Sequence, residues 1–235
     1  MTSTPPTAEQ YRDAYSALHR RLDDLLAPTH GAEPVPSCPG WTVRDVLAHL
    51  VGLCDDWINN RLGGYATPSW TADQVARHSG YTISALLERW TRLVREFAQL
   101  DDHPAMGPPA RWAFGDAIIH EADLRGALGA ARAPHAAVLL SLEGTIVRWR
   151  DVLSNTRPPT MLVLRPIDAP EWTLGPVTED APVVVRPAAY ELFRALAGRR
   201  TEEQVRAWSW SGNPDAILIA GLPYPFQWAE SPITD

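Results

Sequence analysis

The helical spacing of apolar residues in the first half of the chain is the strongest constraint on its fold. Apolar side chains recur every three and four residues, the period of one face of an α-helix, within residues 7–26, 43–62, 71–100 and 111–128. Gly63-Gly64 is the expected end of the second helix, and Ser79-Gly80 is the expected break in the third. Successive helices of this kind predict an antiparallel four-helix bundle.

The pattern changes towards the C-terminus, where short β-type runs replace long helices. A further helical stretch at residues 136–153 ends before Arg157-Pro158-Pro159. Short β-branched runs separated by Pro and Gly follow at 161–165, 171–174 and 183–186, and a helix is expected from Pro187 to Leu196. Residues 208–210 and 217–220 are the candidates for one more strand. The chain is therefore predicted to be α+β, with a helical-bundle domain at 1–132 and a small α+β domain at 133–235.

Composition narrows the range of functions. The 21 Lys+Arg residues are all arginine, which excludes a Schiff-base lysine and a P-loop lysine. The formal net charge of -7 argues against nucleic acid as a partner. No apolar run is long enough for a membrane span, and the first residues lack the features of a signal peptide, so we expect a cytoplasmic protein. Both a monomer and a homodimer are compatible with the sequence.

The most specific polar pattern lies in the fourth helical stretch. At about 100° per residue, Asp116, His120 and Asp123 fall within about 60° of one another on the helix surface. Apolar residues share that face, so these side chains are expected to point inward, where a charge needs a partner or a metal. Glu121 and Arg125 point away from it and are expected in solvent.

A second helix offers a third candidate for this site. Thr42 with Asp45 three positions later is typical of a helix N-cap, and His49 follows one turn beyond Asp45. Two histidines and one aspartate from facing helices match the ligand count of an open catalytic zinc site. Either Asp45 or Asp123 is placed to orient a ligating histidine. The alternative is a buried His–carboxylate network without metal.

The other thiols and imidazoles carry weaker signals. Cys54 lies on an apolar helix face and is expected in the core. Cys38 precedes Pro-Gly and is expected to be more exposed, and its sequence context places no histidine near it. The remaining histidines are expected at the surface or in loops: His19, His30, His78, His103 and His135.

Residues 38–50, CPGWTVRDVLAHL, resemble a signature of the mycothiol-dependent maleylpyruvate isomerase family, within the DinB-like superfamily of metal-binding four-helix bundles. A second signature of that family is similar to residues 116–129, DAIIHEADLRGALG. The segments 168–175, 183–200 and 210–213 also resemble its C-terminal part, so the resemblance covers nearly the whole chain.

The resemblance implies a DinB-like bundle followed by a domain similar to sterol carrier protein. It implies a divalent metal, usually zinc, held by His49, Asp116 and His120, with mycothiol as co-substrate. The family typically has Glu where Asp116 stands, and Asp is one methylene shorter. Arg199, after the C-terminal helix, is the candidate clamp for a carboxylate of thiol or substrate. Asp123 is the second candidate catalytic residue.

These observations support one leading hypothesis and two alternatives. The leading one is a metal- and mycothiol-dependent isomerase or transferase, in which a metal-bound thiolate attacks a small electrophile. The alternatives are a thiol-independent metal hydrolase and a non-catalytic module that binds a small molecule. The absence of lysine fits a GC-rich coding sequence, which suits an actinobacterial host.

Overall fold

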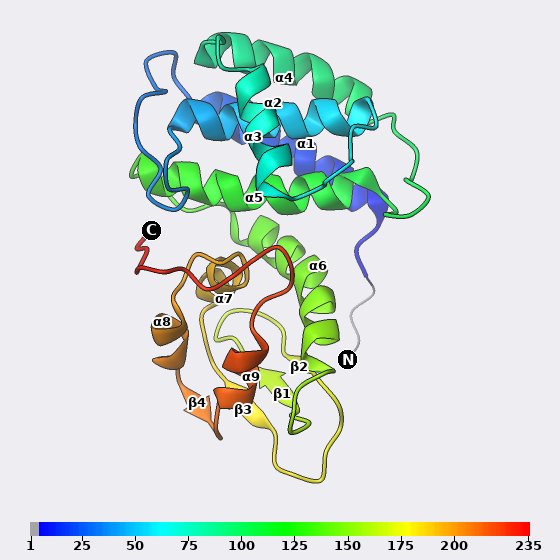
Figure 1. Cartoon of the computed structure of the whole chain (residues 1–235), viewed down its shortest axis with the longest axis vertical. Helices are drawn as coiled ribbons and strands as arrows, with labels where there is room; N and C mark the ends of the chain where they lie inside the picture. Colours follow the sequence, from blue (N-terminus) through cyan, green and yellow to red (C-terminus); the bar gives the residue numbers. More distant parts are fainter. Residues whose placement is uncertain (1–4) are drawn as a thin grey trace. The chain divides into compact units, whose positions relative to one another are not determined.

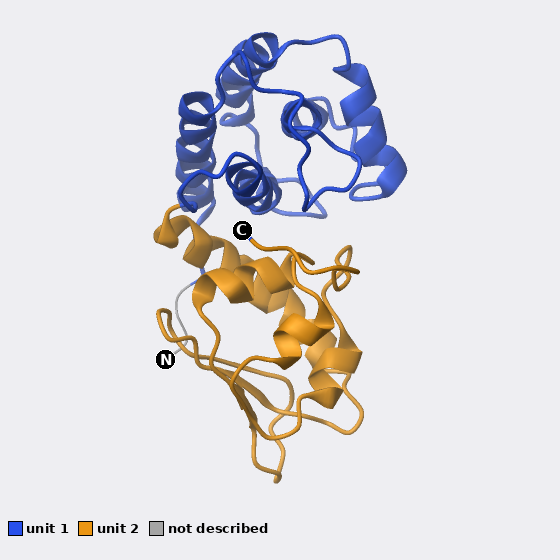
Figure 2. Ribbon diagram, turned by 90° about the vertical axis from the view of Figure 1, so that its left-hand side faces the viewer, with its two compact units in different colours: residues 1–133, 235 blue, residues 134–234 orange. Residues whose placement is uncertain are grey.

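The computed structural model describes residues 5–235 and divides them into two compact units (Figure 2). Unit 1 comprises the chain up to Ala133 together with Asp235, and unit 2 comprises Pro134–Thr234. No helix within residues 5–235 combines the length and the apolar character that crossing a membrane requires.

Unit 1 is a helical bundle (Figure 1). Its described helices are α1 (Ala8–Leu25), α2 (Val43–Ile58), α3 (Pro68–Arg77), α4 (Ile83–Phe97) and α5 (Pro109–Ala127). Helix α1 packs on α5, and α2 packs on α3, α4 and α5. The α2–α5 contact matters most here, because it brings together the two helices that carry the candidate metal ligands.

The four helices expected from apolar spacing are confirmed, with one difference, at the end of the second helix. The third is split into α3 and α4 around Ser79-Gly80, as expected. Helix α2 ends earlier than Gly63-Gly64, at Ile58. There the Asn59 side chain donates to the Asp55 carbonyl at 2.9 Å, and Asn60 takes a φ of 51°. Asparagine tolerates this left-handed conformation, so it can end a helix much as glycine does.

Unit 2 is a small α+β unit. Its sheet contains β1 (Leu162–Leu164), β2 (Trp172–Leu174), β3 (Val183–Val185) and β4 (Trp210–Ser211) in the order β2-β1-β3-β4. Strands β1 and β3 are parallel, and the other neighbouring pairs are antiparallel. The described helices are α6 (His135–Leu153), α7 (Ala189–Leu196), α8 (Glu202–Arg206) and α9 (Asp215–Ala220). The predicted α+β class is confirmed.

The last strand of unit 2 forms at only one of its two candidate segments. Trp210 enters β4, whereas residues 217–220 lie in helix α9. A four-residue apolar run does not distinguish a strand from one turn of buried helix. Here Ile217 and Leu218 are buried while Ile219 is exposed, as expected for one helix turn against a core. Trp208 and Trp210 pack against that core.

A buried ion pair joins α1 to α5, where solvated side chains were expected. Glu121 is fully buried, and its carboxylate accepts two hydrogen bonds from Arg21, at 2.8 and 2.6 Å. Arg125 donates to the same carboxylate at 2.9 Å. The expectation that Glu121 and Arg125 lie in solvent is therefore wrong. The helix period gives the direction of each side chain, but not which neighbouring helix covers it.

Removing this carboxylate should destabilise unit 1. Glu121→Ala is expected to lower the free energy of unfolding by about 2–4 kcal/mol, because two guanidinium groups lose their buried partner. The value is at the lower end for a buried pair, since the side chains of Arg21 and Arg125 remain 23% and 14% exposed. Urea denaturation followed by circular dichroism measures the change.

The matched control is Glu171→Ala, which removes an Arg–Glu pair whose side chains are 44% and 46% exposed. It should change the free energy of unfolding by about 0.5 kcal/mol or less. Equal losses for the two variants would contradict a structural role of the buried pair.

Candidate metal centre

Helix α2 places His49 at the α2–α5 contact. The helix starts at a reciprocal cap, in which the Thr42 hydroxyl accepts from the Asp45 amide at 3.3 Å and the Asp45 carboxylate accepts from the Thr42 amide at 3.0 Å. Asp45 also pairs with Arg44 at 2.5 Å. The Asp45 carboxylate therefore caps the helix. Of Asp45 and Asp123, the two carboxylates considered for orienting a histidine, Asp123 is the one that contacts His120. His49 is buried one turn further along.

Helix α5 supplies the other candidates on one face, as the spacing predicted. Asp116 and His120 are four residues apart, and Asp123 follows after three more. The His120 side chain is 10% exposed and that of Asp123 is fully buried. Asp116 is more open, at 33% of its side-chain surface. The cluster is thus closed at one end and reaches solvent at Asp116.

Three candidate ligand atoms converge between α2 and α5. His49 Nε2 lies 2.9 Å from Asp116 Oδ2, and His120 Nε2 lies 4.0 Å from the same oxygen. One ligand atom from each of these residues lies within 4.8 Å of the other two. In a tetrahedral zinc site with bonds of about 2.0–2.2 Å, ligand atoms lie about 3.4 Å apart. The two measured separations, 2.9 and 4.0 Å, lie on either side of that spacing.

The outer nitrogen of each imidazole already has a partner. His120 Nδ1 lies 3.0 Å from Asp123 Oδ2, and because a carboxylate only accepts, Nδ1 carries the proton. His49 Nδ1 lies 2.7 Å from Gln74 Oε1. This pattern, with the outer N–H held by an oxygen and the inner nitrogen turned to the centre, is the usual arrangement of histidines that bind metal. The residues present therefore fit a divalent cation.

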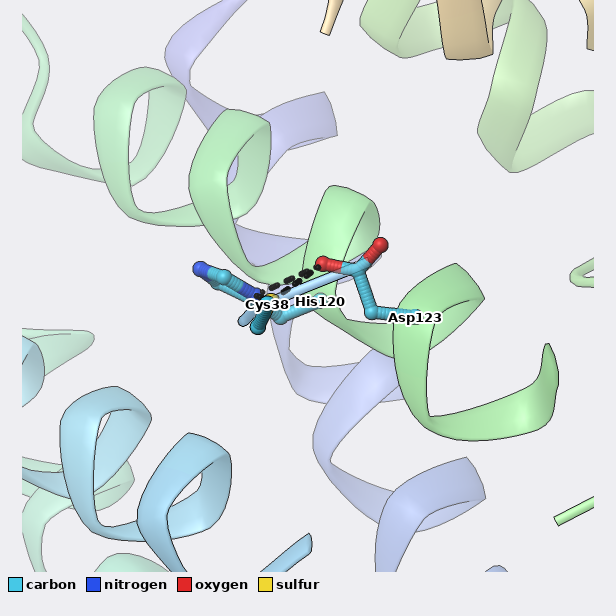
Figure 3. A group of neighbouring side chains, drawn as sticks. All are labelled: Cys38, His120 and Asp123. Atoms are coloured by element: carbon cyan, nitrogen blue, oxygen red, sulfur yellow. Dashed lines mark hydrogen bonds and ion pairs between the residues drawn. The ribbon is translucent and has the colours of Figure 1, made fainter. Parts of the chain in front are cut away.

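Cys38 lies beside the same site, against His120 and Asp123 (Figure 3). Its thiol donates to Asp123 Oδ2 at 3.2 Å, and its sulfur lies 3.7 Å from His120 Nδ1. The expectation that no histidine lies near Cys38 is wrong. The turn from Val35 to Trp41 folds the segment back, with amide–carbonyl bonds of 2.9–3.0 Å, and no local sequence period signals this approach.

Cys38, His120 and Asp123 form a second group with the atoms for a metal site. Its contacts, however, are ordinary hydrogen bonds, since the thiol and Nδ1 protons lie between the heavy atoms that meet. In the first group, His49 Nε2 lies 2.9 Å from Asp116 Oδ2, and a cation can take the place of the proton between these two atoms. The first group is therefore the better candidate for a cation.

An aromatic wall borders the ligand cluster. The Trp41 ring stacks on His120 with a centroid distance of 6.2 Å and is tilted against His49 at 5.4 Å. The two imidazoles meet edge to face at 4.9 Å. Trp41 immediately precedes the cap of α2, so the cap that starts the helix also sets this ring beside the ligands. Sequence spacing alone did not assign it to the site.

The remaining thiol and two of the remaining histidines belong to the core. Burial raises the pKa of the Cys54 thiol to about 12, so this thiol stays protonated at neutral pH, as expected for a core residue. His19 and His78 are also buried, at 8% and 3% exposure, which corrects their expected surface positions. Burial lowers the pKa of both imidazoles. His19 meets Trp90 edge to face, and His78 contacts the Gln74 carbonyl at 2.9 Å.

Arg199 lies in unit 2, directly after the glycine that ends α7. Its guanidinium donates to the Ala197 carbonyl at 2.9 Å, and the residue is half-buried. The next residue, Arg200, is held by Glu191 through bonds of 2.7 and 3.2 Å. Arg200 is therefore committed to its own unit, and the clamp role of Arg199 stays a prediction.

Comparisons with known proteins identify the same scaffold. Residues 15–125 match the family described as the mycothiol maleylpyruvate isomerase N-terminal domain. No curated protein matches the chain. Two solved structures resemble it, that of the mycothiol-dependent maleylpyruvate isomerase and that of a histidine-to-alanine mutant of this enzyme. Each is 18% identical, with a TM-score of 0.54 over 95% of this chain and 98% of the other.

At this identity the structural likeness concerns the fold, which is shared along nearly the whole chain. The family match is more specific, because it covers α2 and nearly all of α5. It includes all three candidate ligands, His49, Asp116 and His120. Most of the helical unit, residues 15–125, is therefore similar to the family of mycothiol maleylpyruvate isomerase N-terminal domains.

Proposed function

We propose that the chain is a metal- and thiol-dependent enzyme that uses mycothiol, or a thiol of that class, to isomerise or S-conjugate a small electrophile. The observation that carries the proposal is the convergence of His49, Asp116 and His120 within 4.8 Å. The family that unit 1 resembles and the shared fold support the choice of thiol, since both are named for mycothiol-dependent maleylpyruvate isomerase. The substrate of this chain is proposed only as a class.

The ligand set favours a reactive thiol. A divalent cation held by two neutral imidazoles and one carboxylate keeps a net positive charge, which lowers the pKa of a thiol that enters an open position. Asp123 holds the His120 ring through Nδ1, so that Nε2 keeps its direction. Asp116, the most exposed of the three, marks the open side of the cluster.

The chemistry that follows needs no thiol from this chain. The thiolate sulfur would add to one carbon of an activated C=C bond, so that a C–S bond forms while the π pair moves onto the activating group. If the C–S bond then breaks after rotation about the former double bond, the double bond is restored in the other geometry and the thiol is recycled. If the adduct instead takes up the proton that the thiol released, the product is a thiol conjugate. Arg199 is the proposed clamp for a carboxylate on thiol or substrate, since its planar fork suits bidentate binding.

The metal proposal predicts a stoichiometry that depends on three side chains. The wild-type protein should bind one divalent ion per chain, while His49→Ala, His120→Ala and Asp116→Asn should bind none at micromolar metal, because each removes one of three ligands. Inductively coupled plasma mass spectrometry after desalting measures the content. His135→Ala is the matched control, since this exposed histidine lies in unit 2, where its ring contacts the Asp168 carbonyl.

Full metal content in all three ligand variants would contradict the proposed metal centre. A protein that binds no metal when wild type, yet keeps its fold, would favour the non-catalytic binding module instead.

The thiol proposal predicts a spectroscopic signature. Cobalt-loaded Cys38→Ser protein should gain a sulfur-to-cobalt charge-transfer band in the near ultraviolet when mycothiol is added. Serine at position 38 removes the nearby protein thiol, and Cys54 stays silent because burial raises its pKa to about 12. The Asp116→Asn protein, treated in the same way, should show no band.

Turnover of an ester or amide substrate without added thiol, together with no charge-transfer band, would favour the hydrolase. A band of equal intensity in Asp116→Asn would show that the thiol binds elsewhere.

The clamp proposal predicts a kinetic asymmetry. Arg199→Met should raise the KM for the carboxylate-bearing reactant about tenfold or more and leave metal content unchanged, because one charge-assisted contact is lost. Arg165→Met, which removes an exposed arginine paired with Glu171, is the control. Unchanged KM values for thiol and substrate in Arg199→Met would exclude the clamp.

A further inference from the structure

His49 has an unusual partner on its outer nitrogen. His120 is oriented by a carboxylate, whereas His49 Nδ1 meets the amide oxygen of Gln74 at 2.7 Å. An amide can present either a donor or an acceptor to an imidazole, depending on which way it is turned. The contact with Gln74 therefore leaves open which nitrogen of His49 carries the proton, unless something fixes the amide.

Asp56 fixes it. Gln74 Nε2 donates to Asp56 Oδ2 at 2.8 Å, and both side chains are fully buried. Asp56 Oδ1 accepts from Arg61 Nε at 2.9 Å and from Arg77 Nη2 at 2.5 Å. A carboxylate held by two guanidinium groups can only accept, so the NH₂ group of Gln74 must face it. The oxygen of Gln74 must then face His49.

The orientation of the Gln74 amide determines which nitrogen of His49 can bind a metal. Because Gln74 presents an oxygen, His49 Nδ1 must donate, and in the neutral ring Nε2 is left without a proton. Nε2 is the atom that faces Asp116 at 2.9 Å. A histidine binds metal only through an unprotonated nitrogen, so the polarity of this chain of contacts selects the ligand atom.

The close packing of α2 against α3 makes this contact possible. His49, Gly52 and Asp56 lie three and seven residues apart on one face of α2, and Gln74 comes from α3. A Cβ atom at Gly52 would lie 2.6 Å from the Gln74 Cβ. Only glycine at this position lets α3 approach closely enough for Gln74 to bridge Asp56 and His49.

We propose that Asp56 and Gln74 are positioning residues of the metal centre, acting as a hydrogen-bond relay that holds His49 in the tautomer with Nε2 free to bind a divalent cation. Neither side chain touches the ligand cluster's centre. The inference rests on the proposed function in one respect, that His49 Nε2 is a ligand. The tautomer itself can be measured without metal.

The sharpest variant changes a residue that does not touch His49. In Asp56→Asn the new amide can keep its oxygen towards Arg61 and Arg77 and turn its NH₂ to Gln74. Gln74 then has to flip, so that its own NH₂ faces His49 Nδ1. The imidazole proton is displaced to Nε2, and the ligand atom is blocked.

Two readouts test this. In metal-free, ¹⁵N-labelled protein at a pH where the ring is neutral, long-range ¹H–¹⁵N spectra should show His49 protonated on Nδ1 in the parent and on Nε2 in Asp56→Asn. Both proteins carry Asp116→Ala, so that no carboxylate competes at Nε2. With Asp116 intact, zinc affinity by chelator competition should fall about 10–100-fold in Asp56→Asn.

A double variant separates polarity from simple damage. In Asp56→Asn with Gln74→Glu, the amide and the carboxylate exchange places: Asn donates to Glu, and Glu accepts from His49 Nδ1. Zinc affinity and the Nδ1–H tautomer should both return. Gln74→Met, which removes the relay without reversing it, should weaken zinc about 10–100-fold and serves if Asp56→Asn does not fold.

The matched control is Asp55→Asn, next to Asp56 on α2. Asp55 also pairs with Arg61 and with Arg89, but its bonds do not run to Gln74. Its zinc affinity and the tautomer of His49 should match the wild type. If Asp56→Asn and Gln74→Met bind zinc as tightly as wild type and His49 keeps Nδ1–H, the relay is wrong, whatever the enzyme does. If wild-type protein binds no zinc, the proposed function fails, and the tautomer spectra still decide the relay.

Discussion

Three atoms that can each bind a proton or a cation meet at the α2–α5 contact, and the polar structure of unit 1 depends on holding them there. His49 Nε2 and Asp116 Oδ2 lie 2.9 Å apart, and His120 Nε2 lies 4.0 Å from the same oxygen. At such distances the lone pairs repel unless a proton or a cation lies between the atoms, and the 2.9 Å contact has the length of a hydrogen bond. Much of the polar structure around the site can be understood as the means by which these lone pairs are kept pointing inward.

Two supports of different chemistry, one for each imidazole, hold the outer nitrogens of the two histidines. His120 Nδ1 is held by the buried Asp123 carboxylate, which also accepts from the Cys38 thiol. His49 Nδ1 is held by the Gln74 amide, which is anchored in turn by Asp56 and its two arginines. The arginines matter indirectly, because they keep Asp56 an acceptor. In a chain without lysine, these fixed guanidinium charges give a buried carboxylate its permanent partner.

The sequence predicted the parts of this site that depend on local geometry. Asp116, His120 and Asp123 share a face because residues four and seven apart always do so on a helix. His49 was recognised for the same reason, at the edge of the apolar face of its helix. Cys38 and Gln74 could not be found in this way, since the first arrives through a folded-back turn and the second through a close approach that Gly52 permits. Glu121 shows the same limit, because its burial depends on Arg21 from α1.

If the proposed cation binds, the two supports make the two imidazoles unequal ligands. A carboxylate partner on the outer nitrogen draws the proton more strongly than an amide does, and so makes the inner nitrogen more basic. His120, backed by Asp123, is then the stronger electron donor, and His49, backed by neutral Gln74, is the weaker one. A weaker neutral donor leaves more positive charge on the cation, and with a single carboxylate ligand at Asp116 that charge is not fully offset. Residual positive charge is what a centre needs if its task is to stabilise an incoming thiolate. The neutral amide behind His49 is therefore consistent with thiol chemistry, because it fixes the tautomer without adding a further negative charge to those of Asp116 and Asp123.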